Sequence, residues 1–202
     1  MQGEHWEKIY RTKKTEELSW TEEVPQTSLN LIHQLALAKS ASLIDIGGGE
    51  SKLVDFLLGE GFEHITVLDI SAAALERTKT RLGVSAERVK WITQDILKFT
   101  PDTRFDLWHD RAVFHFLTSE EQIATYVSIA SKLVKTNGFL VIGTFSDKGP
   151  EKCSGLTVRR YTESSLADAF SARFDQISCT RVTHITPFDT NQQFVFCIFR
   201  KN

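Results

Sequence analysis

Short apolar runs alternate with longer amphipathic stretches through most of the chain. The apolar runs are typical of buried strands, which we expect at residues 43–46, 65–69, 89–93, 105–108 and 139–145. The stretches between them place apolar residues at helical spacing, at about 51–60, 71–82 and 118–134. This alternation predicts an α/β fold with a doubly wound, mainly parallel sheet and helices on both faces.

The two ends of the chain follow other patterns. Near the N-terminus, apolar residues at helical spacing predict an amphipathic helix within residues 4–17 and a second helix at about 27–38. Near the C-terminus, a predicted helix at 162–172 precedes two β-rich runs, 174–185 and 192–200. The short connection between these runs predicts a hairpin, which adds an antiparallel pair to the five parallel strands.

The length of 202 residues is that of one domain with a full hydrophobic core. We therefore expect a single domain over residues 1–202. Residues 1–38 form its N-terminal part, and residues 39–202 form its α/β core.

The first predicted strand ends in a turn that is rich in glycine. Residues 43–51 read LIDIGGGES, and Gly47 and Gly49 carry no Cβ, so a ligand can come close to the backbone. A helix is expected to begin near Glu50, with its free N–H groups facing the turn. The chain lacks the phosphate-binding pattern GxxxxGKS or GxxxxGKT. A dinucleotide fingerprint would need a glycine where Lys52 stands.

Acidic residues follow the next two strands. Asp69 lies 20 residues after Gly49, where a carboxylate can accept both hydroxyl groups of a ribose, and Asp95 can accept from an exocyclic amine. Either carboxylate also fits a helix cap. With the glycine turn and no phosphate-binding loop, the two acids favour an adenosine whose 5′ substituent is not a phosphate, as in S-adenosylmethionine.

Four segments follow one another in a characteristic order: Asp45–Gly49, Leu68–Ser71, Gln94–Ile96 and Phe105–Arg111. This series resembles the class I S-adenosylmethionine-dependent methyltransferases. The segments His5–Glu7, Ser19–Trp20, 108–115 and Cys153–Leu156 resemble a subgroup of small bacterial and invertebrate methyltransferase-like proteins of unassigned substrate. The resemblance covers nearly the whole chain. It implies a Rossmann-like seven-stranded sheet of order 3-2-1-4-5-7-6 and an N-terminal helical lid over the cofactor.

The resemblance also implies a set of site residues and a cofactor, S-adenosylmethionine, with S-adenosylhomocysteine as the product. The cofactor-binding positions are Asp45, Gly47, Gly49, Asp69, Ile70, Asp95, Ile96, Asp110 and Arg111. In similar enzymes the position of Asp45 lies near the methionine amino group, and Asp110 and Arg111 lie beside the methionine and the acceptor. The alternatives are a structural carboxylate at Asp45 and a plain Asp110–Arg111 salt bridge.

The acceptor pocket is expected to contain Trp20, Arg111, His115 and Cys153. Arg111 can bind a carboxylate through its planar fork. His115 is a candidate general base, or else a hydrogen-bonded structural histidine, because histidine titrates near neutral pH. Arg111 and His115 are therefore the candidate catalytic residues. Trp6 and Trp20 either anchor the lid or contact a ligand. No metal site is expected, because His109 and His115 do not have the spacing of HExxH and no CxxC is present.

Composition narrows the choice of partners. The net charge of −2 argues against a nucleic-acid binder, and the longest apolar runs fall far short of the ~20 residues of a membrane span. Residues 1–14 contain no apolar segment of a secretory signal. The chain has an odd number of cysteines, Cys153, Cys179 and Cys197, which predicts reduced thiols and hence a cytoplasmic protein. Cys179 and Cys197 are expected in the core. We expect a monomer or a homodimer.

The predicted reaction is methyl transfer by in-line displacement to a nitrogen, oxygen or sulfur atom, most simply of a small molecule. A protein-lysine methyltransferase is the alternative within the class. The tetrapeptide Asp/Asn-Pro-Pro-Tyr/Phe of many amino-group methyltransferases is absent. Two rivals come from other classes: a non-catalytic S-adenosylmethionine-binding protein, and a nucleotide-dependent oxidoreductase, against which Lys52 argues.

Overall fold

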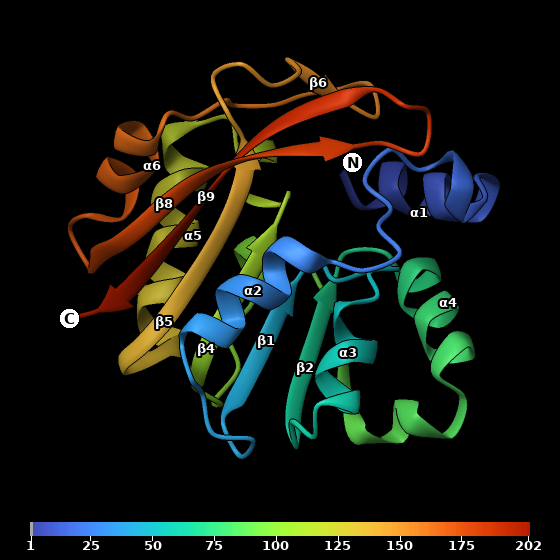
Figure 1. Cartoon of the computed structure of the whole chain (residues 1–202), viewed down its shortest axis with the longest axis horizontal. Helices are drawn as coiled ribbons and strands as arrows, with labels where there is room; N and C mark the ends of the chain where they lie inside the picture. Colours follow the sequence, from blue (N-terminus) through green and yellow to red (C-terminus); the bar gives the residue numbers. More distant parts are fainter. Residues whose placement is uncertain (1) are drawn as a thin grey trace.

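A seven-stranded mixed sheet forms the centre of the protein, with the order β3-β2-β1-β4-β5-β9-β8 (Figure 1). The structure, a computed structural model, describes residues 2–202. The strands are β1 (Ser42–Ile46), β2 (His64–Asp69), β3 (Val89–Thr93), β4 (Phe105–Arg111), β5 (Val134–Phe145), β8 (Phe174–Ile185) and β9 (Asn191–Lys201). β1 to β5 are parallel, and β9 is antiparallel to both of its neighbours. The predicted fold and order are confirmed, because the last strand lies inside the sheet and the strand before it lies at the edge.

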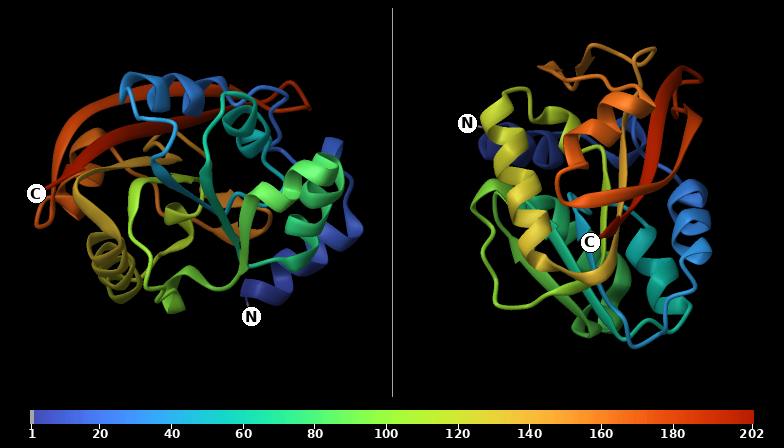
Figure 2. Two further views of the ribbon diagram at one scale, coloured as in Figure 1. Left: turned by 90° about the horizontal axis from the view of Figure 1, so that it is seen from below. Right: turned by 90° about the vertical axis from the view of Figure 1, so that its left-hand side faces the viewer.

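Both faces of the sheet are buried, since neighbouring strand residues point to opposite sides. In β1, Leu43 packs in one apolar cluster with Leu107, and Ile44 packs in the other with Trp108. The first cluster lies under α2 (Gln26–Gln34) and α3 (Leu53–Gly59), and the second under α5 (Glu120–Leu133) and α6 (Glu163–Phe170) (Figures 1 and 2). The carboxyl ends of the strands are therefore where a ligand can enter.

The glycine turn after β1 is longer than the sequence suggests. Helix α3 begins at Leu53, with Lys52 at its N-cap, so the expected helix start near Glu50 is wrong. Glu50 remains in the turn, where its carboxylate accepts a hydrogen bond from Thr15 and forms an ion pair with Arg77 at 3.0 Å. The ligand site is consequently lined here by the turn itself and not by the first N–H groups of a helix.

The N-terminal helix α1 (Gln2–Thr12) lies beyond the carboxyl ends of β1 and β2, beside the start of α4 (Ala72–Leu82) (Figure 1). Ser71 caps α4 as predicted, because its Oγ accepts from the N–H of Ala74 at 3.2 Å. Glu7 of α1 joins this cap: its Oε2 accepts from Ser71 Oγ at 2.7 Å and from the N–H of Ala73 at 3.1 Å. The helix predicted within residues 4–17 ends early, and the 3₁₀ turn η1 (Thr15–Glu17) follows it.

Replacing Glu7 with glutamine is expected to loosen α1 from α4 and to remove part of the acid sensitivity of the fold. The N–H of Ala73, the hydroxyl of Ser71 and the side chain of Arg11 hold the pKa of Glu7 at about 2, below its ordinary value of 4.5. Because this pKa is lowered in the folded state, the contact stabilises the protein above about pH 4.5 and is lost as the pH falls toward 2.

Urea unfolding from about pH 6 down to about pH 3 measures this effect. The free energy of unfolding should fall less steeply in Glu7→Gln than in the wild type. Glu16→Gln, which changes an exposed carboxylate in the same N-terminal segment, should keep the wild-type pH dependence. Identical pH profiles for Glu7→Gln and the wild type would show that Glu7 does not hold the two helices together.

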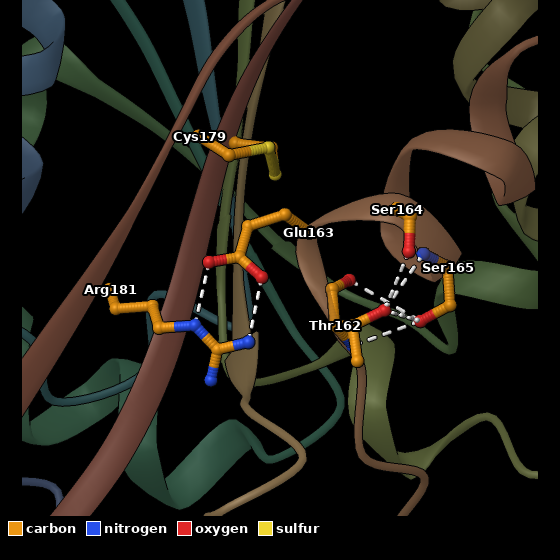
Figure 3. The surroundings of a disulfide bond; sticks show 7 residues. Thr162, Glu163, Ser164, Ser165, Cys179 and Arg181 are labelled. Atoms are coloured by element: carbon orange, nitrogen blue, oxygen red, sulfur yellow. Dashed lines mark hydrogen bonds and ion pairs between the residues drawn. A yellow bond between two sulfur atoms is a disulfide. The ribbon is translucent and has the colours of Figure 1, made fainter.

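The C-terminal hairpin corrects the prediction of three reduced thiols. Cys179 of β8 and Cys197 of β9 stand opposite each other and form a disulfide (Figure 3). Cys197 is buried in the core as expected, whereas Cys179 is only partly buried, and Cys153 is a free, buried thiol. Beside the disulfide, Arg181 of β8 binds both carboxylate oxygens of Glu163, the first residue of α6, at 2.6 and 2.7 Å (Figure 3).

A small second sheet was not expected from the sequence. β6 (Lys152–Cys153) and β7 (Leu156–Thr157) form a short hairpin outside the main sheet. Its turn residues Ser154 and Gly155 have φ angles of 50° and 82°, in the left-handed region that a tight hairpin turn requires. This hairpin holds Cys153 at the edge of the site described below. Within residues 2–202, no helix has the length and apolar character needed to cross a membrane.

Candidate functional site

A cavity at the carboxyl ends of the parallel strands contains most of the predicted site residues. It has about 910 Å³ of empty space, part of which is open to solvent. The predicted residues that line it are Trp20, Gly47, Asp69, Ile70, Asp95, Ile96, Arg111, His115 and Cys153. Asp45, Gly49 and Asp110 do not line this cavity.

Asp69 closes β2 at one end of the cavity. Its side chain is buried, and Oδ1 accepts from the N–H of Ser71 at 2.8 Å. Burial raises the pKa of Asp69 to about 7, although the Ser71 N–H acts in the opposite direction. A Cβ on Gly49 would stand 2.7 Å from Asp69 Oδ2, so glycine at this position makes room for the carboxylate. Asp69 is thus a buried acceptor without a cationic partner among residues 2–202, and two hydroxyl donors would match it.

Asp95 caps a short turn and also lines the cavity. Its Oδ1 accepts from the N–H of Leu97 at 3.0 Å and caps the short turn η3 (Ile96–Lys98). The same side chain lines the cavity together with Gln94 and Ile96. The site next to Asp69 therefore offers polar groups at its rim and the apolar walls Ile70 and Ile96, an arrangement suited to a flat base with an amine.

Gly47 lets the turn approach the cavity floor. Its φ angle is +66°, and a Cβ at this position would stand 2.1 Å from Cγ2 of Val113. No other residue type fits here without a shift of the turn that carries Val113. Two features therefore require glycine at position 47: its positive φ angle and the closeness of the Val113 side chain.

Asp45 takes part in a buried row of hydrogen bonds. Its Oδ1 lies 2.7 Å from His109 Nδ1, and His109 Nε2 lies 2.9 Å from Ser28 Oγ. The three side chains line a second cavity, of about 680 Å³, on the other side of Gly47. Asp45 and His109 stand side by side in β1 and β4, so the parallel register itself brings them together. His109 and His115, whose spacing does not match a metal-binding motif, line different cavities.

Asp110 supports the loop that follows β4. Its Oδ1 accepts from the N–H groups of Val113 and Phe114, at 2.8 and 3.3 Å, and its Oδ2 accepts from the hydroxyl of Tyr126. The side chain is fully buried, and burial raises its pKa to about 6 against these hydrogen bonds. Because its oxygens are occupied and it lines neither cavity, we propose that Asp110 positions the site and does not contact the cofactor.

Arg111 joins the core to the segment between α1 and α2. Its Nη1 donates to the carbonyl oxygen of Trp20 at 3.0 Å, and its Nη2 lies 3.1 Å from Glu22 Oε1. Burial lowers the pKa of Arg111, and the charge of Glu22 opposes that shift. The guanidinium also lies over the ring of Phe194, 5.4 Å from its centroid. Arg111 thus lines both cavities and holds the covering segment in place.

Aromatic side chains from the N-terminal segment cover the cavity. Trp6 packs edge to face on Trp20 and Phe116, with centroids 5.7 and 5.1 Å apart, and Tyr10 packs on Trp20. Trp6, Tyr10 and Trp20 line the cavity as well, so they anchor the cover and also face the ligand space. The expected position of the lid is therefore what the structure shows.

Some lining residues carry no local signal in the sequence. Phe194 and Gln192 come from β9, and Phe145 ends β5. Only the assembled sheet brings them to the glycine turn, and nothing in their own segments points to a ligand. Among residues 2–202, no group of three or more His, Cys, Asp or Glu side chains is arranged to hold a metal ion.

Comparison with known proteins shows what the chain is similar to. Residues 44–140 match the family model of a methyltransferase domain. The fold matches the crystal structure of Burkholderia thailandensis 1,6-didemethyltoxoflavin-N1-methyltransferase with bound 1,6-didemethyltoxoflavin and S-adenosylhomocysteine. The TM-score is 0.79, at 21% identity over 100% of this chain and 87% of that chain. Residues 44–140 are thus similar to a methyltransferase domain, and the chain has the fold of the class I methyltransferases.

The chain is also similar in sequence to two curated proteins. Mouse (Mus musculus) EEF1A lysine methyltransferase 2 is 25% identical over 85% of this chain and 71% of its own length. Nodulation protein S of Bradyrhizobium diazoefficiens is 25% identical over 54% of this chain. The methyltransferase spans about half of that second relative, 51% of its length.

The cofactor of this methyltransferase class is S-adenosylmethionine, and the residues present fit it. The buried Asp69 matches a ribose diol, the rim with Asp95 matches an adenine amine, and Gly47 leaves room that a Cβ would fill. Asp69 and Arg111 line the same cavity.

Proposed function

We propose that this methyltransferase transfers the methyl group of S-adenosylmethionine to a nitrogen, oxygen or sulfur atom of a small organic acceptor. One observation carries the proposal: a single cavity joins the cofactor residues to a second, aromatic-walled region. We define that region, the acceptor compartment, by Arg111, His115, Phe145, Cys153, Gln192 and Phe194. When a ligand is bound at Asp69 and Asp95, the acceptor compartment stays free for a second molecule.

The chain's own residues position the two molecules and exclude water. The cofactor supplies an already activated methyl group, so binding geometry is the main task of the protein. Trp6, Tyr10 and Trp20 cover the cavity, and Arg111 ties that cover to the acceptor compartment through Trp20 and Glu22. We propose that Gly47 and the second cavity, with Asp45 near it, hold the methionine part.

A protein-lysine methyltransferase is the second candidate. It is favoured by the similarity to mouse EEF1A lysine methyltransferase 2 over 85% of the chain. The covered cavity favours the small-molecule proposal, because a lysine side chain attached to a protein would have to enter beside Trp6 and Trp20. The buried cation of Arg111 also repels an incoming ammonium group.

A labelling experiment separates these candidates. An extract of the source cells is divided by ultrafiltration into small molecules and macromolecules. Each fraction is incubated with the protein and S-adenosylmethionine labelled in its methyl group. We expect label in the small-molecule fraction, and less label with Asp69→Asn at a subsaturating concentration of S-adenosylmethionine. Label on protein lysines would favour the second candidate. Absence of transfer by a protein that binds S-adenosylhomocysteine would instead indicate a non-catalytic binding protein.

A further inference from the structure

His115 is a buried polar residue of the acceptor compartment, and only one of its two ring nitrogens has a hydrogen-bond partner among residues 2–202. It lies in the turn η4 (Phe114–Phe116), its side chain is fully buried, and it stacks on Phe145 with ring centroids 4.5 Å apart. The N–H of Phe145 donates to Nδ1 at 3.2 Å. Nε2 has no hydrogen-bond partner among residues 2–202, although the residue lines the cavity.

This arrangement sets the tautomer of the ring. Nδ1 accepts a hydrogen bond, so it carries no proton, and the single proton of the neutral imidazole is on Nε2. Burial and the charge of Arg111 lower the pKa of His115 to about 3, so the ring is neutral near pH 7. A ring with its proton on Nε2 has no lone pair there and cannot take a proton from the acceptor. It can donate a hydrogen bond.

Arg111 and Cys153 of the acceptor compartment are hydrogen-bond donors too, and Gln192 carries both a donor and an acceptor. Nη2 of Arg111 is buried, and although Glu22 lies 3.1 Å away, no acceptor is aligned with its N–H bonds. Cys153 keeps its proton, because burial raises the pKa of its thiol to about 11. The carboxylate of Glu22 is engaged by Arg111 and by His184, whose Nδ1 lies 3.3 Å away. The compartment therefore has N–H groups without acceptors and a buried positive charge.

We propose that His115 and Arg111 select an acceptor with an anionic group that accepts hydrogen bonds, such as a carboxylate, on a flat apolar body. This inference rests on the proposed function and specifies its substrate class. The flat body follows from the rings of Phe145 and Phe194, which line the same compartment. A cationic acceptor, such as a lysine side chain, would meet Arg111 and leave the donor of His115 unpaired.

Because His115 cannot take a proton, the nucleophilic atom of the acceptor must be unprotonated when the acceptor binds. Its lone pair forms the bond to the methyl carbon as the carbon–sulfur bond breaks, and the sulfur keeps the electron pair of that bond. A thiolate or an unprotonated ring nitrogen needs no proton acceptor in this step. Among residues 2–202 the carboxylates that line the cavity, Asp69 and Asp95, lie at the cofactor end, so the acceptor compartment supplies no base. The compartment therefore favours a thiolate or a ring nitrogen over an alcohol, which needs a base.

Three matched probes test the selection of the acceptor. They are para-mercaptobenzoate, its methyl ester and para-mercaptobenzylamine, which differ only in carrying an anionic, a neutral or a cationic group opposite the thiol. Each is titrated calorimetrically into protein saturated with S-adenosylhomocysteine. We expect the carboxylate to bind at least about tenfold more tightly than either of the others, the scale of a charge-assisted hydrogen bond.

Variants identify the groups responsible. His115→Phe and Arg111→Gln should lose the preference for the carboxylate, whereas His115→Gln, which keeps an N–H donor, should retain part of it. His64→Phe, at the opposite end of β2, should behave as the wild type. If no probe binds, or all three bind equally, while S-adenosylhomocysteine still binds, the inference is overturned and the proposed function stands. Loss of S-adenosylhomocysteine binding in the wild type would overturn both.

Nitrogen NMR of histidine-labelled protein checks the tautomer independently. The ring of His115, assigned by its loss in His115→Gln, should carry its proton on Nε2 and remain neutral from about pH 5 to about pH 8. The ring signals of the exposed His64 serve as the internal comparison. A proton on Nδ1, or protonation of His115 within that interval, would contradict the donor role.

Discussion

Asp69→Asn is expected to weaken binding of S-adenosylhomocysteine by about 10- to 100-fold, on the order of 1–3 kcal/mol. The asparagine can still accept from the N–H of Ser71, as Asp69 Oδ1 does at 2.8 Å, so the turn should keep its shape. The amide can no longer accept from both ribose hydroxyls. The loss should therefore appear in ligand affinity, measured by calorimetric titration, and not in the free energy of unfolding.

The same residue predicts a pH dependence of cofactor binding. Burial raises the pKa of Asp69 to about 7 in the free protein. Donation by two hydroxyls favours the ionised carboxylate and so lowers this pKa in the complex. Binding must then release a proton below pH 7, and the affinity should fall as the pH decreases, by up to about tenfold per pH unit, and level off above pH 7.

Asp69→Asn should lack this dependence, and Asp175→Asn, at an exposed position of β8, should keep both the affinity and the pH profile of the wild type. An unchanged affinity in folded Asp69→Asn would remove Asp69 from the ligand site. A wild-type affinity that is flat from about pH 5 to about pH 8 would show that the carboxylate is already ionised before binding.

Asp110→Ala is expected to lower the free energy of unfolding by about 3–5 kcal/mol. The change removes the acceptor for the N–H groups of Val113 and Phe114 and for the hydroxyl of Tyr126, of which the last two are buried and the first is partly buried. Each buried donor left without a partner costs about 1–3 kcal/mol. Val113 also packs above Gly47, so the loosened loop should weaken cofactor binding as well.

Urea unfolding and titration with S-adenosylhomocysteine measure the two effects. Asp110→Asn keeps an oxygen for the two N–H groups and should lose less stability than Asp110→Ala. Asp102→Ala, an exposed residue in the loop before β4, is the matched control and should be neutral. A free energy of unfolding within about 1 kcal/mol of the wild type in Asp110→Ala would contradict the supporting role of this carboxylate.

The parts of this protein that the sequence predicts well are those marked by local features, such as apolar runs and N-cap residues. Asp69 and the cap Ser71 follow a strand whose limits are marked by apolar residues, and the helices after β2 and β4 begin at strong N-caps. Strand order came from the family resemblance, because periodicity carries no information on which strands are neighbours. The start of α3 was misplaced, because the turn after Gly49 is held by Glu50 contacts with distant Thr15 and Arg77.

Strand register decides most of what the sequence does not show. Asp45 meets His109 because the two are neighbours in β1 and β4. Cys179 faces Cys197 only after a register shift between Gln176 and Ser178 in β8. The partners of His115 and Arg111 likewise come from β5 and from the segment before α2. No local pattern predicts such pairs, since each depends on how segments far apart in the chain align.

The central claim is that the cavity between Asp69 and Arg111 is the S-adenosylmethionine site of a methyltransferase. Calorimetric titration of the purified protein with S-adenosylhomocysteine tests it most directly, with NAD and ATP as controls. We expect saturable binding of S-adenosylhomocysteine at one site per chain, and no binding of either nucleotide. If a protein shown to be folded binds no S-adenosylhomocysteine, or binds NAD more tightly, the glycine turn and its carboxylates are not a methyl-donor site.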